Sequence, residues 1–215
     1  RYIGGLSQFR KIENPIKLSA NESALGPSPK AIEAFEKEKN KLFKYPEDDS
    51  NSLRKALSNK FKIDSKRIIC GSGSDQIFDL TCRLFLNPGD EVIVTEFGFI
   101  MYKIYASLSR AKIVLAKEKN FKASVEEIIK KVSDKTKIVF IANPNNPTGT
   151  YLSKNEMLDL RKKLRSDILL VVDDAYFEFI DSENFSSGLD LFGDSANVLI
   201  TRTFSKIYGL AGLRL

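Results

Sequence analysis

Apolar residues follow two rhythms along the chain. Between residues 27 and 60 they recur at helical spacing, and from residue 67 they gather in short runs separated by longer amphipathic stretches. Short apolar runs are typical of buried strands, and the longer stretches are typical of helices that cover a sheet. The pattern predicts strands over residues 67–70, 91–95, 112–115, 138–142, 168–172 and 198–201. It predicts helices over residues 52–60, 74–86, 100–108, 125–132 and 154–165.

Local signals support several of these boundaries. Pro-Ser-Pro at residues 27–29 predicts the start of a helix in an N-terminal arm, with Ile32, Phe35 and Leu42 on its apolar side. Later in the chain, two capping boxes predict helix starts. They pair Ser124 with Glu127 and Ser153 with Glu156.

The alternation of strands and helices predicts an α/β fold with a mostly parallel sheet covered on both faces, a three-layer α/β/α arrangement. Residues 1–44 would form an N-terminal arm and helix, and residues 45–215 one large domain. In such sheets, ligands bind beyond the C-terminal ends of the strands. Candidate functional residues are therefore sought immediately after each predicted strand.

The composition excludes several kinds of chemistry. The chain has 215 residues and no histidine, which removes Ser-His and Cys-His nucleophiles and histidine zinc motifs. The net charge of +6 comes from lysines spread among acids, as on a solvated surface rather than a nucleic-acid footprint. Acid–base chemistry must therefore use lysine, tyrosine or carboxylates.

The cysteines and the hydropathy pattern indicate a cytoplasmic protein. Cys70 and Cys82 form neither a CxxC pair nor a disulfide framework, and a reducing compartment fits them. No signal peptide and no apolar run long enough to span a bilayer is present. The chain begins at Arg1, so we expect its start to be incomplete.

Two polar segments follow predicted strands and could meet a ligand. Residues 71–75, Gly-Ser-Gly-Ser-Asp, open a helix whose free amides could bind phosphate, although Gln76 stands where a dinucleotide motif needs its third glycine. A plain turn is the alternative for that segment. Residues 143–149, Asn-Pro-Asn-Asn-Pro-Thr-Gly, predict a rigid loop that aims an asparagine amide into the cleft, or a purely structural loop.

A carboxylate and a lysine follow the last two predicted strands. Asp173 comes after the apolar run Ile-Leu-Leu-Val-Val and is expected to be partly desolvated, with a cationic partner. Capping of a turn or metal binding are alternatives, although no compact carboxylate cluster supports a metal. Lys206 lies among hydroxyl and apolar residues, and desolvation would lower the pKa of its amine. A lysine with nearby hydroxyls and Arg214 suits a covalently held phosphate cofactor.

Together these segments resemble the fold-type-I pyridoxal-phosphate (PLP) aminotransferases, and within them the histidinol-phosphate aminotransferase branch. The resemblance covers nearly the whole chain and rests on an ordered set of motifs. These are residues 18–22 (Leu-Ser-Ala-Asn-Glu), 26–29 (Gly-Pro-Ser-Pro), 45–46 (Tyr-Pro), 71–75, 97–102 (Phe-Gly-Phe-Ile-Met-Tyr), 143–149, 173–176 (Asp-Asp-Ala-Tyr) and 205–206 (Ser-Lys) with Arg214.

The resemblance implies a role for each matching residue around the cofactor ring. Lys206 would hold PLP as an internal aldimine and then act as the base that moves the substrate proton. Asp173 would pair with the pyridinium nitrogen and keep the ring an electron sink. Asn146 and Tyr176 would hydrogen-bond the phenolic oxygen of the ring. Phe99 would stack on its face, where many relatives carry tyrosine or histidine.

The resemblance also implies a phosphate site that is completed by a second subunit. Its members would supply backbone, hydroxyl and guanidinium groups: Gly73, Ser74, Asp75, Thr203, Ser205 and Arg214. Tyr45 would reach the phosphate in the neighbouring subunit of a homodimer. A cis peptide bond before Pro147 is also implied.

The implied reaction is amino transfer between histidinol phosphate and the glutamate/2-oxoglutarate pair, in cytoplasmic histidine biosynthesis. Relatives continue for more than a hundred residues beyond Leu215, with a small C-terminal domain and an arginine that grips the substrate. We therefore expect this chain to be a fragment that binds PLP weakly and turns over slowly or not at all.

Other functions would fit the same motifs. An aromatic aminotransferase or an amino-acid-phosphate decarboxylase of the same fold would share most of these motifs. A folded remnant that assembles with a partner without catalysis is another alternative. A nucleotide-binding Rossmann domain is disfavoured by Gln76 and by the position of Lys206.

Overall fold

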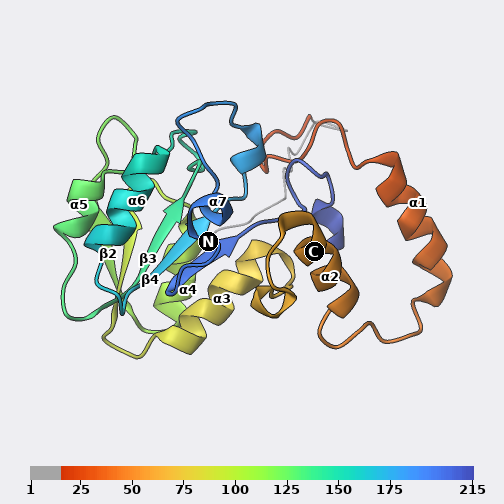
Figure 1. Cartoon of the computed structure of the whole chain (residues 1–215), viewed down its shortest axis with the longest axis horizontal. Helices are drawn as coiled ribbons and strands as arrows, with labels where there is room; N and C mark the ends of the chain where they lie inside the picture. The colour runs from red at the N-terminus through yellow and green to blue at the C-terminus, as the bar shows by residue number, and fades with distance from the viewer. Residues whose placement is uncertain (1–15) are drawn as a thin grey trace, which may run out of the picture. The chain divides into compact units, whose positions relative to one another are not determined.

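The computed structural model describes residues 16–215, which belong to two compact units. One unit contains both ends of the chain, Arg1–Tyr45 and Phe204–Leu215, and the other is the continuous segment Pro46–Thr203. Figure 1 colours the chain from its N-terminus to its C-terminus.

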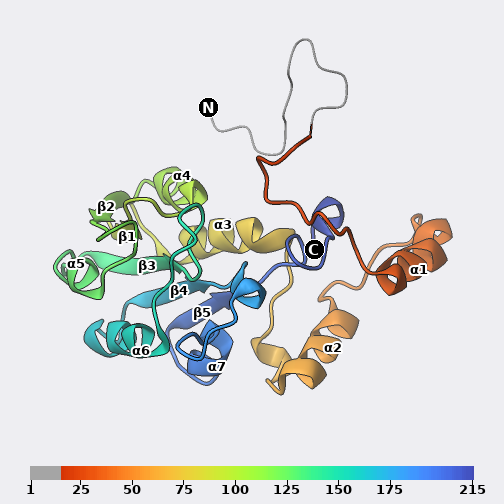
Figure 2. The ribbon, with the colours of Figure 1, turned by 90° about the horizontal axis from the view of Figure 1, so that it is seen from above.

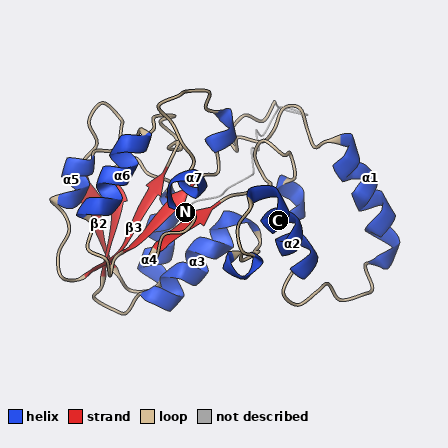
Figure 3. Cartoon of the chain, in the orientation of Figure 1, coloured by secondary structure: helices blue, strands red, loops and turns tan. Residues whose placement is uncertain are grey.

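The unit Pro46–Thr203 is built on a five-stranded sheet in which every described pair of strands is parallel. Figure 3 shows these strands in red. The spatial order is β2-β1-β3-β4-β5, so the sheet grows in both directions from β1. The strands are β1 (Glu91–Thr95), β2 (Lys112–Ala116), β3 (Thr136–Ala142), β4 (Leu169–Asp173) and β5 (Val198–Thr201).

Helices cover both faces of this sheet. Figure 2 shows α3 and α4 on one side and α5, α6 and α7 on the other. The α-helices of this unit are α2 (Asn51–Phe61), α3 (Gly73–Phe85), α4 (Ile100–Leu108), α5 (Val125–Ile129), α6 (Lys154–Lys163) and α7 (Gly188–Phe192). Two short 3₁₀ turns, Ser65–Arg67 and Phe177–Phe179, join them. The three-layer α/β/α fold predicted from the sequence is confirmed.

The strands alternate their side chains between two hydrophobic cores. On one face Val92, Val94 and Phe140 pack with Phe78 of α3 and Tyr102 of α4. On the other face, the neighbouring strand residues pack with α5, α6 and α7. A central strand buried on both faces has to be apolar throughout, which explains the continuous apolar runs in the sequence.

The second unit contains the helix α1 (Pro29–Glu38) and the short 3₁₀ turns Lys39–Lys41 and Ala211–Leu213. Ser28 caps α1 through a hydrogen bond from the Ala31 amide, as Pro-Ser-Pro predicted. The apolar side chains Ile32 and Phe35 remain about half exposed. Gly209, at a φ of +68°, lies directly against the backbone of Gly26 in the arm.

One predicted strand is wrong, and one predicted capping box is incomplete. Residues 68–70 form no ladder with any described strand, so their apolar run stays an irregular segment in which Ile69 is 70% exposed. Ser153 and Glu156 form the reciprocal capping box of α6. Ser124 receives only the amide of Glu127 at the start of α5, without the returning side-chain bond that a complete box has.

Candidate functional site

The chain reverses direction across the sheet between β1 and β3. From β1 it crosses to β2 on one side, and β3 then lies on the other side of β1. The loops after β1 and β3 therefore diverge at the C-terminal edge, which is where open α/β sheets bind ligands. The Asn145 side-chain amide bridges these two loops by donating to the Phe97 carbonyl oxygen at 3.3 Å.

Asp173 ends β4 at this edge and is the most deeply buried of the predicted polar site residues, at 6% exposure. Its Oδ1 accepts hydrogen bonds from the Thr201 hydroxyl at 3.1 Å and from the Ala175 amide at 3.2 Å. Its Oδ2 accepts one from the Tyr102 hydroxyl at 2.6 Å. Burial raises the pKa of the Asp173 carboxyl, and these three donors oppose the rise.

The sequence led to the expectation of a cationic partner for Asp173, and no described residue of the protein supplies one. The groups that the structure places on this carboxylate are a phenol, a hydroxyl and a backbone amide, all neutral. Neutral donors can stabilise a buried carboxylate because each one points a partial positive charge at it.

Tyr102 and Thr201 are members of this site that were not predicted from the sequence. Tyr102 lies 71 positions before Asp173 and reaches it from α4, on the core face of the sheet. The available signal was its position three residues after Phe99, in the motif 97–102, which places both rings on the same side of α4. Thr201 is the last residue of β5 and stands opposite Asp173 in the register of the sheet.

Three other predicted site residues, Asn146, Tyr176 and Phe99, belong to the same unit as Asp173. The Asn146 amide lies 3.5 Å from the Tyr176 hydroxyl, at the limit of a hydrogen bond. Phe99 packs edge-on against Tyr102, with ring centroids 5.7 Å apart. The peptide bond between Asn146 and Pro147 is cis, as expected, and so is the one between residues 143 and 144.

The predicted phosphate residues of this unit lie at two element ends. Gly73 opens α3 at a φ of +72°, a conformation that favours glycine, and Ser74 and Asp75 form the first turn. Thr203 follows β5 by two residues. The amide of Ser72, before the helix, donates to Gln76 Oε1 at 2.6 Å.

The remaining predicted residues belong to the unit formed by the chain ends. The Lys206 ammonium donates to the carbonyl oxygen of Ala20 in the arm at 3.0 Å. Arg214 donates to the Ser205 hydroxyl at 3.2 Å, so two of the predicted phosphate ligands lie side by side. Tyr45 is 99% exposed.

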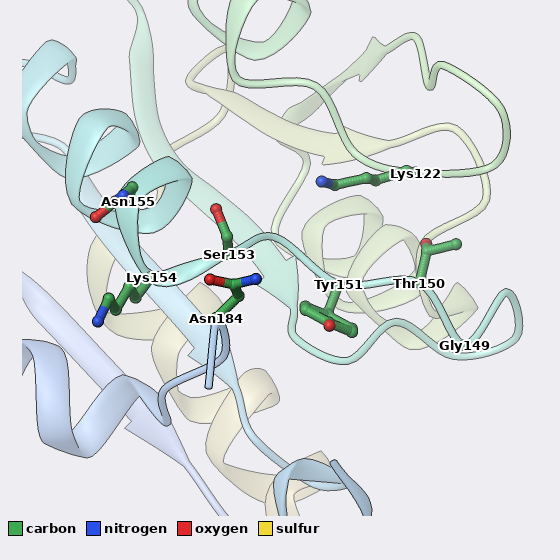
Figure 4. A pocket seen from close by; sticks show the side chains of 8 residues that line it. All are labelled: Lys122, Gly149, Thr150, Tyr151, Ser153, Lys154, Asn155 and Asn184. Atoms are coloured by element: carbon green, nitrogen blue, oxygen red, sulfur yellow. The ribbon is translucent and has the colours of Figure 1, made fainter. Parts of the chain in front are cut away.

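A separate hollow of about 530 Å³ opens beside the N-terminus of α6 in the unit Pro46–Thr203. Figure 4 shows its lining side chains, among them Lys122, Tyr151, Lys154 and Asn184. Lys122 forms a bidentate ion pair with Glu156, and the Lys154 amide donates to the Asn184 carbonyl oxygen. None of the predicted site residues lines this hollow.

Over residues 16–215, no group of three or more His, Cys, Asp or Glu is arranged to hold a metal ion. Among the same residues, no helix combines the length and the apolar surface that crossing a membrane requires.

Comparison with known proteins gives a consistent set of relatives. Residues 13–215 match the family model described as aminotransferase class I and II. A histidinol-phosphate aminotransferase of Pelagibacter ubique is 59% identical over 213 residues, and one of Paramagnetospirillum magneticum is 47% identical over 214 residues. These alignments cover 99% and 100% of this chain but only 59% of each relative.

The fold matches solved structures of the same kind. The crystal structure of histidinol-phosphate aminotransferase from Sinorhizobium meliloti, in complex with pyridoxal-5'-phosphate, superposes with a TM-score of 0.86 at 28% identity. The match covers 91% of this chain and 53% of that one. The chain thus spans a little over half the length of the proteins that it resembles.

Proposed function

The chain belongs to the class I and II aminotransferase family. We propose that it acts as a histidinol-phosphate aminotransferase that depends on PLP. The observation that carries this proposal is the 59% identity, over 99% of the chain, to a protein of that name. The buried carboxylate at the end of β4 supports the cofactor. The substrates, the cofactor and the assembly are all parts of the proposal.

The donors and acceptors of the unit Pro46–Thr203 fit the PLP ring. Asp173 offers a buried carboxylate that accepts from three neutral donors, and such a carboxylate suits a protonated ring nitrogen. Asn146 and Tyr176 place an amide and a phenol within 3.5 Å of each other, a pairing that suits a phenolic oxygen between them. Phe99 supplies an aromatic face.

The residues of the other unit fit the cofactor's aldehyde and phosphate. A primary amine such as that of Lys206 can bond covalently to an aldehyde carbon. The Arg214 guanidinium and the Ser205 hydroxyl, 3.2 Å apart, suit two oxygens of one phosphate. We assign Gly73, Ser74, Asp75 and Thr203 to the same phosphate as backbone and side-chain donors.

Each residue then has a defined task. PLP, when bound, supplies an electron sink for the carbanion formed at the substrate carbon. Asp173 holds the ring nitrogen positive, and Asn146 and Tyr176 orient the ring. The Lys206 amine would act as the base that takes the proton from the substrate carbon.

We further propose that two copies of the protein form a dimer. Tyr45 is 99% exposed, which leaves its hydroxyl accessible to a second subunit. In that dimer Tyr45 would donate to the cofactor phosphate of the partner. Tyr45→Phe should then weaken phosphate binding only where the dimer forms.

An amino-transfer assay tests the proposed substrate class. The chain is loaded with PLP and given 2-oxoglutarate with L-histidinol phosphate, L-histidinol or L-tyrosine, and glutamate is measured. We expect glutamate to form faster from L-histidinol phosphate than from the other two donors. We expect Lys206→Ala to form none. Preference for L-tyrosine, or release of CO₂ from an amino-acid phosphate, would replace the proposal by an aromatic aminotransferase or a decarboxylase.

A further inference from the structure

Tyr102 is the largest fully buried side chain among the described residues, at 1% exposure. Its ring stacks on Phe140 with centroids 4.7 Å apart and planes at 6°, and Phe78 meets it edge-on at 5.0 Å. Three aromatic contacts, with Phe99 as the third, fix the ring in one orientation. The hydroxyl is therefore aimed by packing from the helices and the sheet.

This hydroxyl meets the one Asp173 oxygen that no other described group contacts. Thr201 and Ala175 donate to Oδ1, whereas Tyr102 alone donates to Oδ2 at 2.6 Å. A distance of 2.5–2.7 Å is typical of a hydroxyl that donates to an ionised carboxylate. An ionised carboxylate has about four acceptor positions, so three donors leave one position, on Oδ2.

We propose that Tyr102 is a positioning residue for the reaction: its hydroxyl holds Oδ2 of Asp173 so that the carboxylate stays ionised and keeps its last acceptor position for a cationic ring nitrogen. This proposal rests on the proposed function for the identity of the ring. In this role, the aromatic rings that pack around Tyr102 help to keep the Asp173 carboxylate ionised.

The electrostatics of the buried groups agree with this role. Burial first, and then the charge of Asp173, raise the pKa of Tyr102 well above its usual value, so the phenol remains a donor at physiological pH. The Tyr102 hydroxyl in turn lowers the pKa of Asp173 against the effect of burial. The negative charge of Asp75 raises the pKa of both groups, so on Asp173 it opposes the effect of Tyr102.

The first test needs no cofactor. Carboxyl ¹³C NMR of the apo chain, labelled at aspartate and assigned with Asp173→Asn, gives the titration midpoint of Asp173. We expect Tyr102→Phe to move this midpoint upward, and Tyr105→Phe, which removes a phenol from the same helix, to leave it in place. An unchanged midpoint in folded Tyr102→Phe protein would overturn the proposal.

The second test asks whether the effect passes through the ring nitrogen. Affinity is measured for PLP and for its 1-deaza analogue, which has a carbon in place of the ring nitrogen. Tyr102→Phe should lower the affinity for PLP roughly tenfold, as expected for the loss of one hydrogen bond to a charged group. The affinity for the analogue should be nearly unchanged. Equal weakening of both would show a purely structural role and overturn the proposal.

The two tests also separate this proposal from the proposed function. If the wild-type chain binds neither PLP nor the analogue, the cofactor assignment fails. The NMR midpoint still decides whether Tyr102 controls Asp173 in that case. If PLP binds and labels Lys206 but both tests show no dependence on Tyr102, only the inference about Tyr102 fails.

Discussion

At the scale of single residues, two adjacent carboxylates at the end of β4 lie on opposite sides: Asp173 is its last residue and Asp174 follows it. Asp173 faces the core that contains Tyr102 and receives three donors. Asp174 faces α7, where its Oδ2 accepts the Gly188 amide at 2.7 Å and its Oδ1 has no partner among the described residues. These two neighbouring aspartates therefore have different hydrogen-bond partners, because successive side chains of an extended chain point to opposite faces.

Asp174→Asn should change how stability depends on pH. Burial first raises the pKa of Asp174 well above its usual value, so folding favours its protonated form. Its contribution is therefore most favourable below the unfolded pKa of about 3.9 and is lost as pH rises through the folded pKa. The neutral amide keeps an acceptor for Gly188 and does not ionise.

Urea unfolding of both proteins between pH 4 and pH 8 measures this effect. The stability of Asp174→Asn relative to the wild type should increase with pH across that range. Asp173 titrates in both proteins, so its own contribution largely cancels in the comparison. Parallel pH dependences of the two proteins would contradict the assignment of a raised pKa to Asp174.

At the scale of elements, an apolar run predicted the bounds of a strand or helix well wherever that element packs against a neighbour. β1, β5 and α4 lie at the predicted residues, because buried strands and an amphipathic helix leave clear patterns. Residues 68–70 carry the same pattern but have no described strand to pair with. A strand forms only beside a neighbouring strand, and the sequence of one apolar run does not show whether that neighbour exists. The contact of Tyr102 with Asp173 could not be predicted because it too joins residues that are far apart in the sequence.

The short helix α7 depends on a residue without a side chain. A Cβ on Gly188 would lie 2.9 Å from Val172 Cγ1 and 3.2 Å from Ile200 Cγ1, so α7 packs against β4 and β5 through bare backbone. Gly188→Ala should therefore destabilise the chain by about 1–3 kcal/mol, as overpacking of a core does. Denaturant unfolding measures this cost.

A double-mutant cycle separates the clash from other effects. Val172→Ala removes the nearest methyl group, so the cost of Gly188→Ala should be smaller in that background than in the wild type. If the two costs simply add, the close approach of α7 to β4 does not limit residue 188.

At the scale of the whole molecule, one unit is continuous and the other joins the two ends of the chain. The ordered motifs predicted a set of candidate site residues, but they carried no information about this division. Asp173 belongs to the continuous unit, while Lys206 belongs with the arm. The arm contributes to the second unit through the Ala20 carbonyl oxygen and through the close approach of Gly26 to Gly209.

Gly209→Ala should loosen the arm. A Cβ at this position would lie 2.4 Å from the backbone carbonyl group of Gly26 and 2.6 Å from the nitrogen of Pro27, and the φ of +68° disfavours alanine as well. We expect faster tryptic cleavage of the arm at Lys17 and Lys30 in this variant. Gly212→Ala is the matched control, because a Cβ there meets nothing within 4 Å.

If Gly209→Ala and Gly212→Ala are cleaved at the same rate as the wild type, the arm is not held by this contact. The experiment requires no cofactor, so it tests the architecture of the unit independently of the proposed chemistry.

The central claim is that Lys206 is the residue that bonds to PLP, and one measurement tests it most directly. The chain is mixed with PLP, reduced with borohydride, digested and mapped by mass spectrometry. We expect one pyridoxyl group on the peptide that contains Lys206, and none at that position in folded Lys206→Ala. A folded wild-type chain that carries the label on another lysine, or carries no label, would contradict it.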